Sequence, residues 1–150
     1  MARYLGHKEA SAVALLADAG VRILNAADSA SRQFVEVFES ILPEDLRIER
    51  VRMTANPPAI ADRDQGMGAW HINNASEFHT VEGGEGIVEF WTAEGAVPVL
   101  LGAGDVMVVV QGAEHRYLPL TEQHWVIRYS IPGDLVGTET GRPSGPWPQI

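Results

Sequence analysis

The stretch from residue 71 to residue 90 reads His71-Ile-Asn-Asn-Ala-Ser-Glu-Phe-His-Thr-Val-Glu-Gly-Gly-Glu-Gly-Ile-Val-Glu-Phe90. β-branched and aromatic residues surround a Gly-Gly pair, which is the pattern of short strands joined by a tight turn. The chain repeats this texture from Leu46 onward. Further strands are expected at residues 69–73, 77–81, 86–92, 97–101, 106–110 and 123–130. Many short strands at a spacing of about ten residues predict a sandwich or barrel of the jelly-roll kind.

The N-terminal part of the chain has helical rather than strand character. Residues 9–19 form an alanine-rich run that Gly20 stops, which predicts a short helix. A second helix is expected to begin at Asp28 or Ser29, because either residue is a good N-cap. Apolar residues then recur at helical spacing until Pro43 ends the pattern.

A chain of 150 residues has the length of one domain with a sizeable core. We expect a helical segment over residues 1–43, a barrel over 44–132 and an irregular tail over 133–150. The tail is rich in Gly, Pro, Ser and Thr, and Trp147 is its candidate anchor. The expected fold class is therefore an all-β barrel with two N-terminal helices.

Composition excludes several classes of function. The chain contains no cysteine, so disulfides, thiolate nucleophiles and sulfur-based metal sites are ruled out. The formal net charge is −9, from 20 acidic and 11 basic residues, which argues against a nucleic-acid partner. No signal peptide and no membrane-spanning stretch is recognisable, so we expect a cytoplasmic protein without membrane contact.

Three of the five histidines lie in the strand region, at His71, His79 and His115. Residues of equal parity share one face of a strand, which groups His71 with Asn73 and Glu77 with His79. His115 follows a turn and begins a neighbouring strand. Taken alone, a strand histidine is more often a hydrogen-bonded structural residue than a ligand. Two imidazoles and a carboxylate in one closed barrel instead form a facial metal-ligand set with open positions.

These residues resemble the two sequence motifs of the cupin superfamily. Residues 71–90 are similar to the first motif, in which His-x-His, a short spacer and Glu precede a turn glycine. The second motif is similar to Gly104-Asp-Val-Met-Val-Val-Val-Gln-Gly-Ala-Glu-His115. Among cupins, the likeness is greatest to acireductone dioxygenase, through these motifs and more weakly over most of the chain.

The resemblance implies a double-stranded β-helix barrel that holds one divalent metal through His71, Glu77 and His115. Iron(II) is the first expectation for the metal, with Ni2+, Mn2+ or Zn2+ as alternatives. The implied activity is that of a metal-dependent dioxygenase that cleaves a small enediol-type substrate.

Two positions depart from the acireductone dioxygenase pattern. Asn73 stands where that family has its second motif histidine, and an amide oxygen is a weaker ligand for these metals. His79 stands where the family has an arginine. His79 has the parity of Glu77, so it is a candidate fourth ligand or general base, with a structural hydrogen bond as the alternative.

Three further residues are candidate substrate contacts: Tyr117, Arg128 and Phe90. Packing or a surface ion pair is the alternative for each of them. Two other functions stay open, namely a cupin that uses its metal as a Lewis acid for isomerase, cyclase or lyase chemistry, and a non-catalytic small-molecule binder. A homodimer is the expected assembly, because exposed strand edges need covering.

Overall fold

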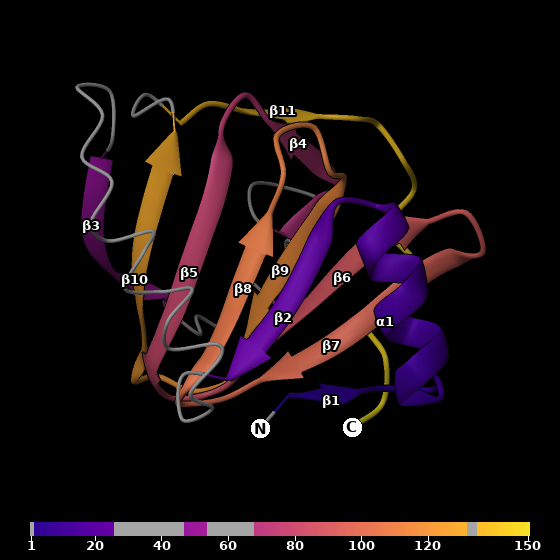
Figure 1. Ribbon diagram of the computed structural model, residues 1–150, viewed down its shortest axis with the longest axis horizontal. Helices are drawn as coiled ribbons and strands as arrows, with labels where there is room; N and C mark the ends of the chain where they lie inside the picture. Colours follow the sequence, from indigo (N-terminus) through magenta and orange to yellow (C-terminus); the bar gives the residue numbers. More distant parts are fainter. Residues whose placement is uncertain (1, 26–46, 54–67, 132–134) are drawn as a thin grey trace.

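The computed structural model describes residues 2–25, 47–53, 68–131 and 135–150. Two antiparallel sheets face each other across the core (Figure 1). The six-stranded sheet has the order β1 (Arg3–Tyr4), β7 (Gly95–Leu101), β6 (Gly86–Thr92), β9 (His115–Pro119), β4 (His71–Asn73) and β11 (Gly137–Glu139). The five-stranded sheet has the order β2 (Val21–Asn25), β8 (Asp105–Val109), β5 (Ser76–Gly83), β10 (His124–Ile131) and β3 (Arg47–Met53).

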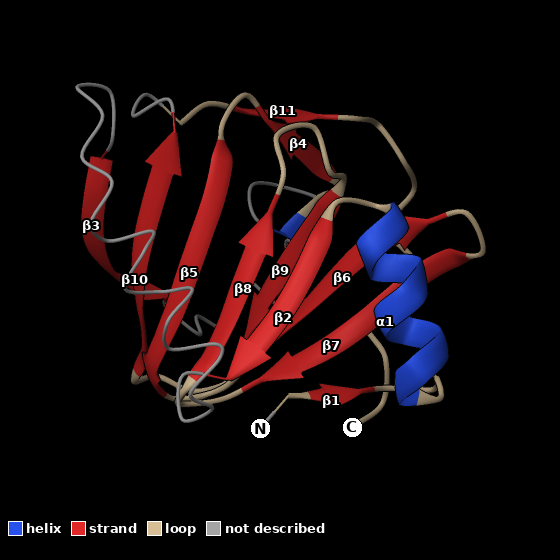
Figure 2. Ribbon diagram, viewed as in Figure 1, coloured by secondary structure: helices blue, strands red, loops and turns tan. Residues whose placement is uncertain are grey.

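Helix α1, from Glu9 to Asp18, lies beside β2 and β7 and is the only helix drawn at that side of the sheets (Figure 2). It inserts Ala12 and Leu16 into the main core, where both side chains are almost fully buried. Gly20 follows the helix with φ +85°, a left-handed conformation that glycine adopts without steric cost and that ends the helix. The predicted first helix is therefore confirmed.

The core between the sheets is built from alternating apolar residues of the strands, among them Val81, Val88, Phe90, Met107 and Val126. Within the described part of the chain, no helix has the length and apolar character to cross a membrane. Each of the strands predicted between residues 69 and 130 is present, with ends displaced by at most two residues.

Two further expectations concern the second predicted helix and the irregular C-terminal tail. The described residues contain one helix rather than two, and the second predicted helix, from Asp28 or Ser29 to Pro43, lies outside them. The prediction of an irregular tail is wrong for β11, which pairs with β4. The close approach of β11 to β4 depends on Gly137, because a Cβ there would lie 3.1 Å from Oδ1 of Asn73.

The rest of the tail is anchored as the sequence indicated. The indole of Trp147 packs against a small cluster on the outer face of the six-stranded sheet, made by Ile87, Leu100 and Leu118. The tail therefore passes over both the cavity end and the outer face of this sheet.

Candidate metal site

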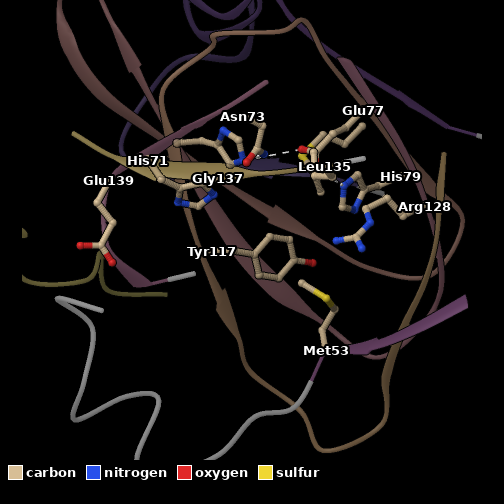
Figure 3. A pocket seen from close by; sticks show the side chains of 12 residues that line it. Met53, His71, Asn73, Glu77, His79, Tyr117, Arg128, Leu135, Gly137 and Glu139 are labelled. Atoms are coloured by element: carbon tan, nitrogen blue, oxygen red, sulfur yellow. Dashed lines mark hydrogen bonds and ion pairs between the residues drawn. The ribbon is translucent and has the colours of Figure 1, made fainter. Parts of the chain in front are cut away.

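A cavity of about 250 Å3 opens between the two sheets, next to the crossing tail. Its polar lining is supplied by side chains that converge from strands of both sheets (Figure 3). The polar and charged lining residues are His71, Asn73, Glu77, His79, His115, Tyr117, Arg128 and Glu139. The volume lies below the range of drug-sized pockets, so the cavity suits a small ligand.

Strand register explains why these side chains meet. His71 on β4 lies directly opposite His115 on β9, and their ring centroids are 4.5 Å apart. Glu77 and His79 are two residues apart on β5, so both project from the same face of the five-stranded sheet. The structure thus brings the five predicted residues together in the lining of one cavity: His71, Asn73, Glu77, His79 and His115.

The carboxylate of Glu77 lies between two imidazoles. Its Oε1 is 3.7 Å from Nε2 of His79, and its Oε2 is 3.8 Å from Nε2 of His115. Two ligand atoms that share one metal ion at about 2.1 Å stand roughly 3.0–3.5 Å apart. Among the described residues, no three His, Asp or Glu side chains are arranged to hold a metal as they stand. Binding of a metal here would therefore require these side chains to move closer together.

The tautomers of two histidines are fixed by the backbone. Nδ1 of His71 lies 2.8 Å from the carbonyl of Ala69, and Nδ1 of His115 lies 2.8 Å from the carbonyl of Ala113. A carbonyl only accepts, so each Nδ1 donates its hydrogen and each Nε2 keeps a lone pair. Metal-ligating histidines are oriented in this way by a carbonyl behind the ring.

The sequence alone does not predict this orienting contact. In both cases the accepting carbonyl lies two residues before the histidine, in Ala69-Trp-His71 and Ala113-Glu-His115. The repeated spacing is the only signal in the sequence, and it acquires meaning once the local backbone conformation is known.

Burial and neighbouring groups set the protonation states of Glu77 and His115. Burial opposes ionisation of Glu77, but the neighbouring His79 ring and the positive charge of Arg128 outweigh it and hold the pKa of Glu77 at about 2. Burial, reinforced by repulsion from His71, lowers the pKa of His115 to about 4. At neutral pH the carboxylate is therefore ionised and the His115 imidazole is neutral.

The roles of His79 and Asn73 differ from those of the two anchored histidines. His79 is buried, yet neither ring nitrogen has a hydrogen-bond partner among the described residues. Nδ2 of Asn73 lies 3.5 Å from Nε2 of His115, at the limit of a hydrogen bond. An amide flip would instead turn Oδ1 of Asn73 toward the same point.

The three residues predicted to contact substrate differ in whether they line the cavity. Tyr117 and Arg128 line the cavity as expected, and the Tyr117 hydroxyl donates to Nε2 of the buried His124. The substrate contact of Phe90 stays a prediction: its side chain is fully buried and is not among the residues that line the cavity. Its ring packs behind His115, at 5.9 Å between centroids, and so helps to hold that imidazole in place.

The metal-free protein is expected to lose stability as the pH falls from about 6.5 to about 4. Over this range the unfolded chain protonates His115 at its ordinary pKa of 6.5, whereas the folded chain resists until about 4. The unfolded state therefore binds more protons than the folded state does, and the free energy of unfolding falls by about 3 kcal/mol. Urea denaturation at pH 7 and pH 4.5 in the presence of a chelator measures the effect.

The pH-dependent loss of stability should shrink in a His115→Asn variant. Part of the loss remains there, because burial also lowers the pKa of His124. His7→Asn is the matched control, since His7 is only partly buried and does not line the cavity. Equal pH-dependent losses in the parent and in His115→Asn would contradict the assigned role of His115.

The comparisons with known proteins concern structure only. No protein-family model matches the sequence, and no curated protein matches it in sequence. Among solved structures, acireductone dioxygenase from Bacillus anthracis, with a cadmium ion in its active centre, is similar over 86% of this chain and 90% of its own. The identity is 14% and the TM-score is 0.54.

Two other solved structures are similar at lower TM-scores. An 11S allergen from Cocos nucifera is 19% identical over 82% of this chain, with a TM-score of 0.49. A variant of oxalate decarboxylase from Bacillus subtilis is 14% identical over 80% of this chain, with a TM-score of 0.44. The chain spans 31% and 27% of these two proteins. From the two facing antiparallel sheets and the likeness to acireductone dioxygenase, we conclude that this chain has the cupin fold.

Proposed function

We propose that this protein is a metal-dependent enzyme that binds one divalent transition metal through His71, Glu77 and His115. The observation that carries the proposal is the pair of histidines whose Nδ1 atoms donate to backbone carbonyls and whose Nε2 atoms are left as ligands. An ionised carboxylate lies beside them, within 3.8 Å of Nε2 of His115.

The donor set fits a first-row divalent ion. Two imidazole nitrogens and a carboxylate suit Fe2+, Ni2+, Mn2+ and Zn2+ and leave coordination positions open. The buried His79 ring, which has no hydrogen-bond partner among the described residues, is a candidate fourth ligand. When bound, the ion would supply Lewis acidity, and iron would also supply access to dioxygen.

The proposed reaction is oxidative cleavage of a small enediol-type substrate by dioxygen. His79 would take a proton from a substrate hydroxyl at Nε2, and the Glu77 carboxylate, which lies 3.7 Å from this atom, would stabilise the imidazolium formed. Tyr117 and Arg128 would position the substrate from the cavity wall. The methionines Met53 and Met107 make the adjoining wall apolar, which limits water in the site.

Lewis-acid chemistry without dioxygen is the second candidate function. It is favoured by His79, since a buried imidazole able to move a proton suits isomerase or lyase reactions as well as oxygenation. The amide of Asn73 at the metal site also distinguishes this chain from the acireductone dioxygenase pattern. Substrate consumed under strict anaerobiosis would identify this chemistry.

The first test is the metal content of the purified protein, before and after anaerobic reconstitution with Fe2+. We expect about one metal ion per chain by elemental analysis. The reconstituted protein should then consume oxygen with dihydroxyfumarate or reductic acid, two small enediols, above the rate of the metal-treated buffer. Little metal after reconstitution would contradict the metalloenzyme proposal, whereas bound metal without oxygen uptake would favour the Lewis-acid alternative.

A further inference from the structure

A row of side chains crosses the five-stranded sheet on its cavity face. Arg128 on β10 lies directly opposite Glu49 on β3 at one side and directly opposite His79 on β5 at the other. His79 in turn lies opposite Met107 on β8. Directly opposite residues point to the same face, so Arg128 stands beside His79 within the cavity wall. Figure 3 shows the Arg128 guanidinium next to the His79 ring.

The hydrogen bonds of Arg128 are incomplete. One terminal nitrogen, Nη2, donates to Oε2 of Glu49 at 2.6 Å. Nε is buried and has no hydrogen-bond partner among the described residues. A buried N–H without an acceptor is costly, and this one belongs to a residue that lines the cavity. Glu49 therefore orients the guanidinium while leaving part of its planar donor fork available to a second acceptor.

The cavity is electrostatically asymmetric. Arg128 is the only arginine or lysine among the described lining residues. Glu139, also in the lining, points its carboxylate away from the histidine cluster, on the side opposite Arg128 (Figure 3). An anionic group on a ligand is thus attracted to the Arg128 end and repelled from the Glu139 end. The histidine cluster lies between these two ends.

We propose that Arg128 binds a carboxylate of the substrate, and that Glu49 is a positioning residue that holds the guanidinium for it. The planar fork of arginine matches the two oxygens of a carboxylate. In a cavity of about 250 Å3, His79, directly opposite Arg128, would then face the oxygen on the next carbon of the ligand. The substrate class is a small carboxylic acid with an oxygen on the next carbon. The inference deepens the proposed function. It rests on that function only for the part of the ligand that would contact the metal.

The test compares the binding of pyruvate with that of pyruvamide, its neutral analogue, by isothermal titration calorimetry on the metal-reconstituted protein. We expect pyruvate to bind at least about tenfold more tightly, the usual gain from a hydrogen bond to a charged group. Arg128→Gln should remove this preference. Arg128→Lys should keep part of it, because the charge remains but the fork is lost. Glu49→Gln should weaken pyruvate binding by less than Arg128→Gln does.

Arg50→Gln is the matched control, because Arg50 lies on the same strand as Glu49 and pairs with the partly exposed Glu82 instead. It should leave pyruvate binding unchanged. Metal content is measured in every sample, and Arg128→Gln is expected to retain its metal. A parent that binds no metal contradicts the proposed function.

A metal-loaded parent that binds both probes equally, or neither, overturns the carboxylate inference alone. The same inference is overturned if Arg128→Gln binds pyruvate as tightly as the parent does. The comparison of the two probes on the parent protein holds even if a variant folds poorly.

Discussion

Alanine at position 115 is expected to raise the Kd for a divalent metal by at least about a hundredfold. The imidazole of His115 faces the carboxylate of Glu77 and is anchored from behind by the carbonyl of Ala113. Zinc sites in folded peptides bind with about 10–16 kcal/mol spread over four ligands, so one ligand accounts for roughly 3 kcal/mol. Glu77→Ala should have an effect of similar size, because it removes the carboxylate that faces two of the imidazoles.

Competition with a chromophoric chelator measures both affinities. His7→Ala serves as the control, since this histidine is only partly buried, lies between β1 and α1 and does not line the cavity. Thermal unfolding followed by circular dichroism checks that the variants fold. If His115→Ala folds and binds metal as tightly as His7→Ala does, the proposed ligand set is wrong.

Arg116→Ala is expected to destabilise the protein by about 3–5 kcal/mol. The Arg116 side chain is buried and donates from Nε to the equally buried carboxylate of Glu89. Its guanidinium lies between two indole rings, 5.1 Å from the centroid of Trp70 and 4.0 Å from that of Trp147. Alanine would leave the Glu89 carboxylate buried without its partner and would loosen the tail.

Urea denaturation of the metal-free protein gives the change in the free energy of unfolding. The double variant Arg116→Met, Glu89→Gln should lose less stability than Arg116→Ala, because no charge is left buried alone. Arg52→Ala is the surface control, with an expected change below about 0.5 kcal/mol. A loss below about 1 kcal/mol for Arg116→Ala would show that the buried ion pair contributes little.

Much of the fold follows from patterns that are local in the sequence. The strands from residue 69 to residue 130 are marked by β-branched and aromatic runs between glycine turns, and their bounds are predicted to within two residues. The side chains of Glu77 and His79 share a face because they are two residues apart in one strand. Such local periodicity grouped Glu77 with His79 and His71 with Asn73, whereas the link to His115 came from the resemblance to the two cupin motifs.

What the sequence does not reveal is pairing between distant segments. The register that sets His71 opposite His115, and Arg128 opposite His79, depends on which strands are neighbours. β11 has the composition of a loop and becomes a strand because β4 offers it an edge. Phe90 was expected to contact substrate, and it does share a sheet face with His115, but packing in the core leaves its side chain fully buried.

The place of β11 in the chain has a consequence for biosynthesis. A ribosome delivers the chain from its N-terminus, so β4, β5 and β9 emerge before β11 does. Until residues 137–139 arrive, a nascent chain presents His71 and Asn73 along an open sheet edge, exposed to water. The cavity wall is then completed by β11, which follows the other strands of the wall in the sequence. Enclosure of the site therefore waits until after the imidazole-bearing strands have been synthesised.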